Sequence, residues 1–290
     1  MQEQEYKIEN IKSFELADIF DCGQCFRWNK QEDGSYTGIF RKNVINVQKQ
    51  KNTIIFKGIC DGEIKEIVED YFDLKRNYEE IKNKLSQIDE NVKTSIEYGQ
   101  GIRILNQDLW EMIISYIISA NNNIPRIKGI IERLSKTYGQ EIEWNGEKYY
   151  TFPTPEELKD VTVEDYRKLG AGFRDIRLYE TVHMILDKKV NLEEMQNNSN
   201  TLEVREQLLT LSGVGPKVAD CILLFSTLKR FEVFPIDVWV SRVMNELNIK
   251  NEDETKVNKK EIEKLAHAKF GNLAGIAQQY LFYWRREAQK

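Results

Sequence analysis

The chain has 290 residues, of which 41% are hydrophobic and 31% charged, a composition typical of a globular protein with a sizeable core. No apolar run approaches the roughly 20 residues that span a bilayer, and the polar start leads us to expect no secretory signal peptide. The formal net charge of −5 argues against binding nucleic acid through overall charge, although a local basic surface or backbone N–H groups can still hold phosphates.

Cys22, Cys25, Cys60 and Cys221 are the cysteines of the chain. Without a secretory signal we expect reduced thiols in a cytosol-like compartment. Cys22 and Cys25 form one CxxC, but a structural zinc site needs four ligands and there is no second CxxC or nearby pair of histidines. We therefore predict ordinary thiols, no metal and no cofactor.

The first third of the chain has a mixed pattern. Residues 35–40, 44–48 and 53–58 are short runs rich in Ile, Val, Thr, Tyr and Phe, separated by turn-prone pieces, which is typical of an antiparallel strand meander. Apolar residues then recur at helical spacing over 64–71 and 78–88. We predict an N-terminal α/β domain over residues 1–95.

From about residue 95 the pattern is almost wholly helical, apart from a break at 149–155. Pro125 fits the first turn of a helix, where its missing N–H is harmless. The overall prediction is an α+β fold, mostly α, in which residues 96–290 form two helical subdomains with a cleft between them. The predicted helices cover residues 109–117, 124–134, 173–186, 204–211, 217–228, 238–247, 261–270 and 273–287.

Residues 211–221, Leu-Ser-Gly-Val-Gly-Pro-Lys-Val-Ala-Asp-Cys, predict two helices joined by a tight hairpin. Gly213 and Gly215 allow positive φ and close backbone approach, and Pro216 suits the first turn of the second helix. Free N–H groups of Gly213, Gly215 and Val218 would then meet a phosphate without reading base sequence. The alternative is an ordinary packed turn between helices; the apolar flanks and the Pro-Lys start favour phosphate binding.

Lys217 is the candidate nucleophile. It lies in the first turn of the second helix, where the positive end of the helix dipole disfavours another cation. We therefore expect a lowered pKa and a neutral amine. Cys221 follows four residues later and shares its face of the helix.

Asp237, in Phe-Pro-Ile-Asp-Val-Trp, is the candidate carboxylate. It precedes the apolar pattern of the next helix and is expected to be its N-cap. A carboxylate held in this way by backbone N–H groups can stabilise a cationic sugar during loss of a base.

These motifs resemble the helix-hairpin-helix DNA glycosylase superfamily and, within it, the 8-oxoguanine DNA glycosylases. The resemblance covers about residues 14 to 286. Besides the hairpin and Pro-Ile-Asp-Val, four ordered segments are similar to family motifs: residues 23–28 (Gly-Gln-Cys-Phe-Arg-Trp), 119–127 (around Asn-Asn-Asn-Ile), 169–174 (Leu-Gly-Ala-Gly-Phe-Arg) and 274–282 (Ala-Gly-Ile-Ala-Gln-Gln-Tyr-Leu-Phe).

The resemblance implies roles for these residues. Lys217 attacks C1′ and forms a Schiff base, and Asp237 assists base loss. Four residues would bind the flipped base: the Gly23 carbonyl accepts N7–H of 8-oxoguanine, Phe282 and Cys221 sandwich the base, and Gln278 bonds its Watson–Crick edge. Four others would contact the duplex: Asn121 fills the gap, Arg126 and Arg174 face the estranged base, and Phe173 is a wedge beside it.

Residue by residue, simpler interpretations stay open. Phe282 can be plain core, Gln278 a solvated side chain, and residues 121–123 a helix cap. The chain also departs from familiar animal sequences, with Trp239 where they carry His and Phe173 where they carry Tyr. These two departures put a phosphate contact and the selectivity for the opposite base in doubt.

The predicted activity is excision of 8-oxoguanine from duplex DNA, followed by β-elimination, by a monomer with no membrane association. The alternatives are a monofunctional alkylation-repair glycosylase of the same fold, which would use the aspartate alone, and a non-catalytic DNA-binding module. The expected compartment is the bacterial cytoplasm, or the nucleus if the source is eukaryotic.

Overall fold

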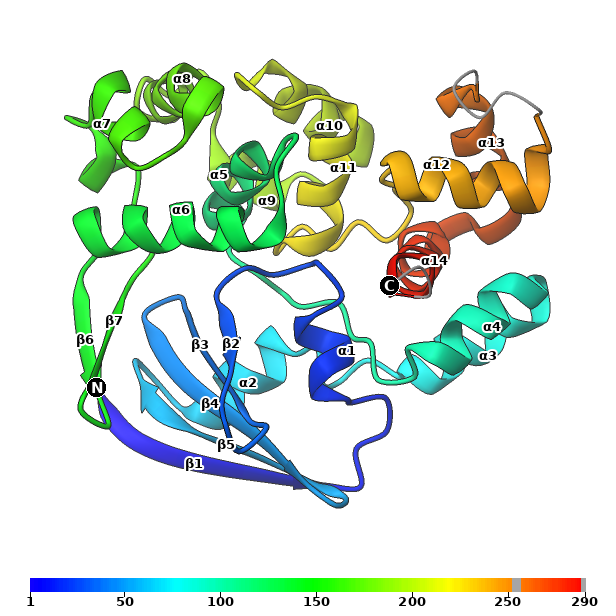
Figure 1. The fold of residues 1–290 in the computed structure, drawn as a ribbon, viewed down its shortest axis with the longest axis horizontal. Coiled ribbons are helices and arrows are strands. Elements are labelled where there is room, and N and C mark those ends of the chain that lie inside the picture. Colours follow the sequence, from blue (N-terminus) through cyan, green and yellow to red (C-terminus); the bar gives the residue numbers. More distant parts are fainter. Residues whose placement is uncertain (252–256, 288–290) are drawn as a thin grey trace.

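The structure is a computed structural model that describes residues 1–251 and 257–287 (Figure 1). Its N-terminal part is built on an antiparallel sheet in the order β1-β5-β4-β3-β2. The predicted meander is confirmed, and its three strands are the middle members of the sheet. The strands are β1 (Gln2–Glu9), β2 (Trp28–Lys30), β3 (Tyr36–Phe40), β4 (Asn43–Gln50) and β5 (Thr53–Cys60).

Strand β1 was not predicted from the sequence. It pairs along its whole length with β5, from Gln2 opposite Cys60 to Glu9 opposite Thr53. Only Tyr6 and Ile8 pack against the core cluster beneath it, and its other positions carry Gln, Glu and Lys. A polar edge strand of this kind lacks the β-branched and aromatic residues by which strands are recognised.

An aromatic core fills the space between the sheet and the helices α1 (Leu16–Phe20) and α2 (Ile64–Tyr71). Phe20 stacks on Trp28 with ring centroids 4.3 Å apart. Trp28 also donates from Nε1 to the Tyr71 hydroxyl over 3.0 Å, so its one polar atom is satisfied in the core. Phe26 and Trp28 are both buried and pack rather than bind, as expected.

A second hairpin, β6 (Glu141–Trp144) and β7 (Glu147–Tyr150), corrects the prediction that the chain beyond residue 95 is almost wholly helical, with a break at 149–155. Asn145 and Gly146 form its turn with φ of 54° and 78°, the backbone of a type I′ turn, for which Asn-Gly is the favoured pair. Trp144 packs in a small cluster with residues of β3 and β4, so the hairpin is attached to the sheet.

The rest of the structure is helical (Figure 1). Ten of the eleven residues of α5 are buried, and α5 contacts α6, α8 and α11, which makes it the central helix. The helices are α3 (Tyr78–Ile88), α4 (Glu90–Tyr98), α5 (Leu109–Ser119), α6 (Ile124–Tyr138), α7 (Val163–Lys168), α8 (Asp175–Leu186), α9 (Leu192–Asn197), α10 (Thr201–Thr210), α11 (Pro216–Phe225), α12 (Val238–Met244), α13 (Lys259–Phe270) and α14 (Ala274–Glu287), with short helical turns at Glu156–Leu158, Gly172–Arg174, Asn245–Ile249 and Gly271–Leu273.

The predicted helices from residue 109 onward are all present, with ends displaced by a few residues. Pro125 and Pro216 lie in the first turns of α6 and α11, as predicted. Helices α3 and α4 follow the sheet in sequence, but α4 packs on α14, and Leu85, Val92 and Ile96 belong to the helical core. The division at residue 95 stays a prediction.

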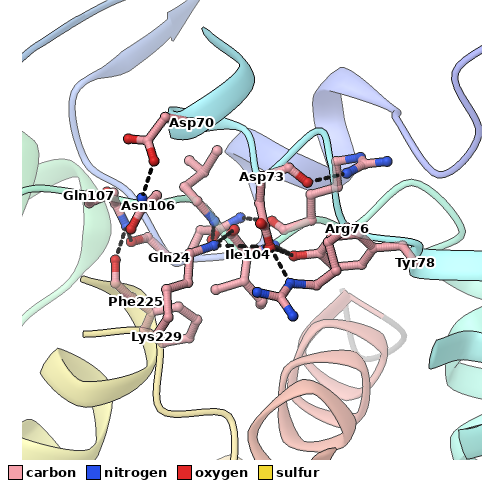
Figure 2. A network of polar contacts seen from close by, with 12 residues as sticks. Gln24, Asp70, Asp73, Arg76, Tyr78, Ile104, Asn106, Gln107, Phe225 and Lys229 are labelled. Atoms are coloured by element: carbon pink, nitrogen blue, oxygen red, sulfur yellow. Dashed lines mark hydrogen bonds and ion pairs between the residues drawn. The ribbon is translucent and has the colours of Figure 1, made fainter. Parts of the chain in front are cut away.

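Buried polar contacts join the sheet region to the end of α11 (Figure 2). Gln107 donates from Nε2 to the carbonyl of Gln24 at 2.8 Å and to that of Phe225 at 3.1 Å. Lys229 donates to the carbonyl of Ile104 at 2.6 Å and forms an ion pair with Asp73 at 3.3 Å. The loop that carries Gly23 and the helix that carries Lys217 are thus tied to one polar network.

Candidate active site

The hairpin between α10 and α11 has the predicted positive φ at Gly213 but not at Gly215. Gly213 has φ of 85°, and a Cβ there would lie 2.9 Å from Cδ of Arg177, so both conformation and space favour glycine. Gly215 is the N-cap of α11 with ordinary φ, and a Cβ there would meet nothing within 4 Å. Arg205 of α10 and Asp220 of α11 form an ion pair at 2.6 Å that fixes the two helices together.

Lys217 is half-buried in the first turn of α11. Its Nζ lies 5.4 Å from the centroid of the Tyr116 ring, which belongs to the central helix α5. Its side chain also contacts Cys221 on the next turn. The amine is therefore directed into the protein, between α5 and α11.

The predicted lowering of the Lys217 pKa is wrong for the DNA-free protein. Burial lowers this pKa, but Cys221 and Asp237 together raise it by more, so the pKa lies above its ordinary value. The prediction weighed the helix dipole and omitted the carboxylate, which comes from a different helix. The lysine is therefore an ammonium at neutral pH and has to lose a proton before it can attack an electrophile.

The Cys221 thiol is buried, 3% exposed, and burial raises its pKa to about 11. It is accordingly protonated at neutral pH. Uncharged sulfur with its methylene is a polarizable, apolar surface, which suits a position against the face of an aromatic ring.

Asp237 is the N-cap of α12, as predicted, and accepts a hydrogen bond from the Val240 N–H at 2.8 Å. Its carboxylate lies close enough to Lys217 to raise the pKa of the amine. The capping bond holds the carboxylate on the rigid start of a helix. The nucleophile and carboxylate proposed from sequence are thus brought together.

Gly23 and Phe282 are neighbours, although they are 259 positions apart in the chain. Gly23 has φ of 90°, and a Cβ built on it would lie 3.2 Å from Cε1 of Phe282. The buried Gln279 holds the two segments together, because its Nε2 donates to the Cys22 carbonyl at 2.8 Å. Sequence reasoning missed Gln279, whose partner is a backbone atom that no side-chain motif indicates.

Gln278 is 5% exposed, so the interpretation as a solvated side chain is wrong. Its Oε1 is buried without a hydrogen-bond partner among the described residues. A buried polar atom that lacks a partner is uncommon in a folded protein and requires an explanation. A ligand that donates hydrogen bonds would supply one.

A second group of the predicted residues lies around the start of α6 and the turn before α8. Asn121 is exposed with φ of 50°, and Asn123 caps α6 by accepting from the Arg126 N–H at 3.0 Å. Phe173 is 53% exposed. An exposed aromatic ring beside exposed Asn121 and Arg126 gives this face the residue types that enter a distorted duplex.

Arg174 has a different environment from the one expected. It is 1% exposed, and it donates from Nε to the Ala120 carbonyl at 2.8 Å and from Nη2 to that of Asn121 at 2.8 Å. In this state it supports the Asn121 turn. Its contact with an estranged base stays a prediction that requires these bonds to break.

The described residues contain no group of three or more His, Cys, Asp and Glu side chains that could hold a metal ion. Cys22 and Cys25 are buried free thiols, and burial raises the pKa of Cys22 to about 12. Within the same described ranges, no helix is both long and apolar enough to cross a membrane.

Comparison with known proteins agrees with this geometry. Residues 7–113 match the profile of the 8-oxoguanine DNA glycosylase N-terminal domain, and residues 114–269 match that of the HhH-GPD superfamily base excision DNA repair proteins. The N-glycosylase/DNA lyase of Saccharomyces cerevisiae is 31% identical over 92% of this chain and 82% of its own length. The chain belongs to the 8-oxoguanine DNA glycosylases of the HhH-GPD superfamily.

Solved structures place this 8-oxoguanine DNA glycosylase among its relatives. A Clostridium acetobutylicum 8-oxoguanine glycosylase/lyase, in complex with double-stranded DNA containing cytosine opposite 8-oxoG, superposes with a TM-score of 0.93 at 44% identity, covering 100% of this chain and 99% of that one. A 3-methyladenine DNA-glycosylase from Archaeoglobus fulgidus has a TM-score of 0.77 at 21% identity, covering 97% of this chain and 98% of that one. The second likeness shows a shared fold alone.

Proposed function

We propose that this protein excises 8-oxoguanine from duplex DNA and then cleaves the strand at the abasic site. The observation that carries the proposal is the meeting of Lys217 and Asp237 on two different helices, next to the phosphate-binding type of hairpin. The yeast relative is named for both a glycosylase and a lyase, and the Clostridium relative for 8-oxoguanine.

In the proposed reaction the neutral Lys217 amine attacks C1′ of the lesion. The bond from C1′ to N9 breaks, and the base leaves with the bonding electrons and takes up a proton. The sugar ring opens to a Schiff base on Nζ; loss of a C2′ proton then expels the 3′ phosphate by β-elimination. Asp237 stabilises the positive charge that develops on the sugar, a type of electrostatic assistance that contributes strongly to such transition states.

A flipped base would bind between Cys221 and Phe282, because a base inside the duplex is out of reach of the amine. The Gly23 carbonyl would accept the N7–H that distinguishes 8-oxoguanine from guanine. Gln278 would turn its unpaired Oε1 toward the donors of the Watson–Crick edge. These assignments explain why the position beside Phe282 carries a glycine and why a buried amide oxygen has no partner.

The partner is duplex DNA. The hairpin of Gly213, Gly215 and Val218 would hold a phosphate through backbone N–H groups, which suits a protein with a net negative charge. On the second face, Asn121, Phe173, Arg126 and Arg174 would occupy the gap and contact the estranged base. The protein would act as a monomer, since one chain carries every proposed residue.

Borohydride trapping tests the proposal. The native chain, mixed with an 8-oxoguanine duplex and reduced, is expected to form a covalent adduct of one chain per strand, because borohydride reduces the Schiff base to a stable amine. The Lys217→Gln chain is expected to form none and to leave the strand intact. A cleaved strand from the Lys217→Gln chain would contradict the assignment of the nucleophile.

The same experiment separates the alternatives. A monofunctional alkylation-repair glycosylase would release base without an adduct, and a non-catalytic module would bind without releasing base. The position of Lys217 beside Asp237 favours the bifunctional enzyme over both alternatives. A half-buried lysine next to a carboxylate is typical of a functional site, whereas a lysine without a chemical role is typically exposed to solvent.

A further inference from the structure

Arg286, on the last turn of α14, has a donor without an acceptor. Its Nε pairs with Glu287 at 3.0 Å, and its Nη2 donates to the carbonyl of Asp21. Its Nη1 is buried and has no hydrogen-bond partner among the described residues. A buried guanidinium N–H that bonds to nothing is costly, so the position requires an explanation.

The unpaired nitrogen faces the proposed base pocket. A Cβ built on Gly23 would lie 2.8 Å from Nη1 of Arg286 and 3.2 Å from Cε1 of Phe282. The guanidinium carbon is 5.2 Å from the centroid of the Phe282 ring. Nη1 is therefore next to both the glycine and the ring against which the base would stack.

The spacing along α14 shows which part of a base Arg286 would meet. Gln278, Phe282 and Arg286 are four residues apart and share one face of the helix. Along this face Phe282 therefore lies between Gln278, whose acceptor Oε1 is buried and unpaired, and Arg286, whose donor Nη1 is buried and unpaired. A purine stacked on Phe282 with N1–H and the 2-amino group toward Gln278 directs its imidazole ring toward Arg286.

We propose that Arg286 is a specificity-determining residue that donates a hydrogen bond from Nη1 to the O8 carbonyl of the flipped base. This inference rests on the proposed function and deepens it. In 8-oxoguanine, O8 is adjacent to the N7–H that Gly23 would accept, so the protein would bind both atoms by which the lesion differs from guanine. Guanine offers neither, since its C8 carries hydrogen and its N7 is an acceptor.

Arg286→Met tests the inference, because methionine keeps an unbranched side chain over Phe282 and removes the donor. Single-turnover excision of 8-oxoguanine is expected to slow about 10- to 100-fold, the loss typical of one charge-assisted hydrogen bond. Cleavage of a preformed abasic site, which needs Lys217 but no base, is expected to keep its native rate. In the Lys217→Gln background, the substitution is expected to weaken binding to the 8-oxoguanine duplex and to leave binding to the matched guanine duplex unchanged.

Arg285→Met is the matched control, since it removes the same charge from the neighbouring position, where Arg285 pairs with Glu246 at 2.5 Å. It is expected to excise 8-oxoguanine at the native rate. Unchanged excision by Arg286→Met would overturn the inference, as would an equal loss on the abasic site, which indicates a structural role. Failure of the proposed function is distinguishable, because the native chain itself would then release no 8-oxoguanine.

Discussion

At the scale of single residues, the Asp237 carboxylate has two opposing effects on the proposed reaction of Lys217. The carboxylate stabilises a cationic sugar, but it also raises the pKa of the amine that has to attack as a neutral group. We predict that Asp237→Asn slows base excision about 100-fold, as for loss of other electrostatic stabilisers, while the Lys217 pKa falls because an anion is removed. Asparagine is also a good N-cap, so α12 is retained.

The check is the pH profile of borohydride trapping on a preformed abasic site, where no base has to leave. Trapping needs the neutral amine, so its rate rises with pH through the Lys217 pKa. In Asp237→Asn this rise is expected at lower pH than in the native chain. An unmoved midpoint, or one displaced to higher pH, would show that Asp237 does not act on the amine. The control for folding is the thermal unfolding midpoint of the variant, which should equal that of the native chain.

Sequence motifs show which chemical groups form this site, but they do not show the environment in which those groups lie. Lys217 and Asp237 are recognisable because glycines and prolines around them impose a turn and two helix starts. The raised pKa of Lys217 is not recognisable, because it depends on contact with Cys221 and on a carboxylate from another helix, which together outweigh the lowering by burial. Arg286 escaped notice for a related reason: its proposed importance comes from contact with Gly23, at the other end of the chain.

At the scale of elements, the two glycines of the hairpin are not equivalent. Gly213 has φ of 85° and is close to Arg177, whereas Gly215 has an ordinary backbone and open space at its Cβ position. We predict that Gly213→Ala lowers the free energy of unfolding by about 1–3 kcal/mol, the cost of a left-handed non-glycine residue. Gly215→Ala is its matched control and is expected to change stability by only a few tenths of a kcal/mol.

Urea unfolding of the native chain and the two variants measures this difference. The prediction fails if both variants lose equal stability, because the cost would then come from losing any glycine rather than from the turn. The substituted chains also separate folding from DNA binding. Gly215→Ala keeps stability, so weakened binding to undamaged duplex in that variant would reflect the phosphate-binding surface alone.

Element prediction succeeded where apolar periodicity was strong and failed where pairing partners decide the structure. Helices α5, α6 and α11 have clear apolar patterns and were found within a few residues. Strand β1 is polar and exists because β5 offers it an edge. The β6–β7 hairpin was missed although its Asn145-Gly146 turn is a strong local signal, because each of its strands has only four residues, too few to show a clear alternating pattern.

At the scale of the whole molecule, the connection between the sheet region and the helices includes a buried cation. Lys229 forms an ion pair with Asp73 and donates to the Ile104 carbonyl (Figure 2). Burial outweighs the ion pair and lowers the pKa of Lys229 to about 8. Since α11 carries Lys217 at its start and leads into Lys229 beyond its end, this contact anchors the helix of the nucleophile to the loops around Asp73 and Ile104.

The pH dependence of stability follows from that pKa. Below pH 8 Lys229 is protonated in both folded and unfolded chains, and the cost of burying the charge is fully present. Between about pH 8 and its ordinary value of 10.5 the folded protein binds fewer protons than the unfolded chain, so this residue makes the free energy of unfolding rise with pH. The full rise from one group with this shift is about 3 kcal/mol.

We predict that Lys229→Met removes this rise. Methionine is unbranched and fits the same left-handed backbone, φ 51°, no worse than lysine, so strain is matched. The variant loses the bond to Ile104 at every pH, which displaces its stability by a constant amount. The difference in unfolding free energy between native chain and variant should therefore grow in favour of the native chain from pH 7.5 to pH 10. Parallel stability curves across that range would contradict the prediction. They would mean that the pKa of Lys229 is the same in the folded protein as in the unfolded chain, so that burying this residue has no electrostatic cost.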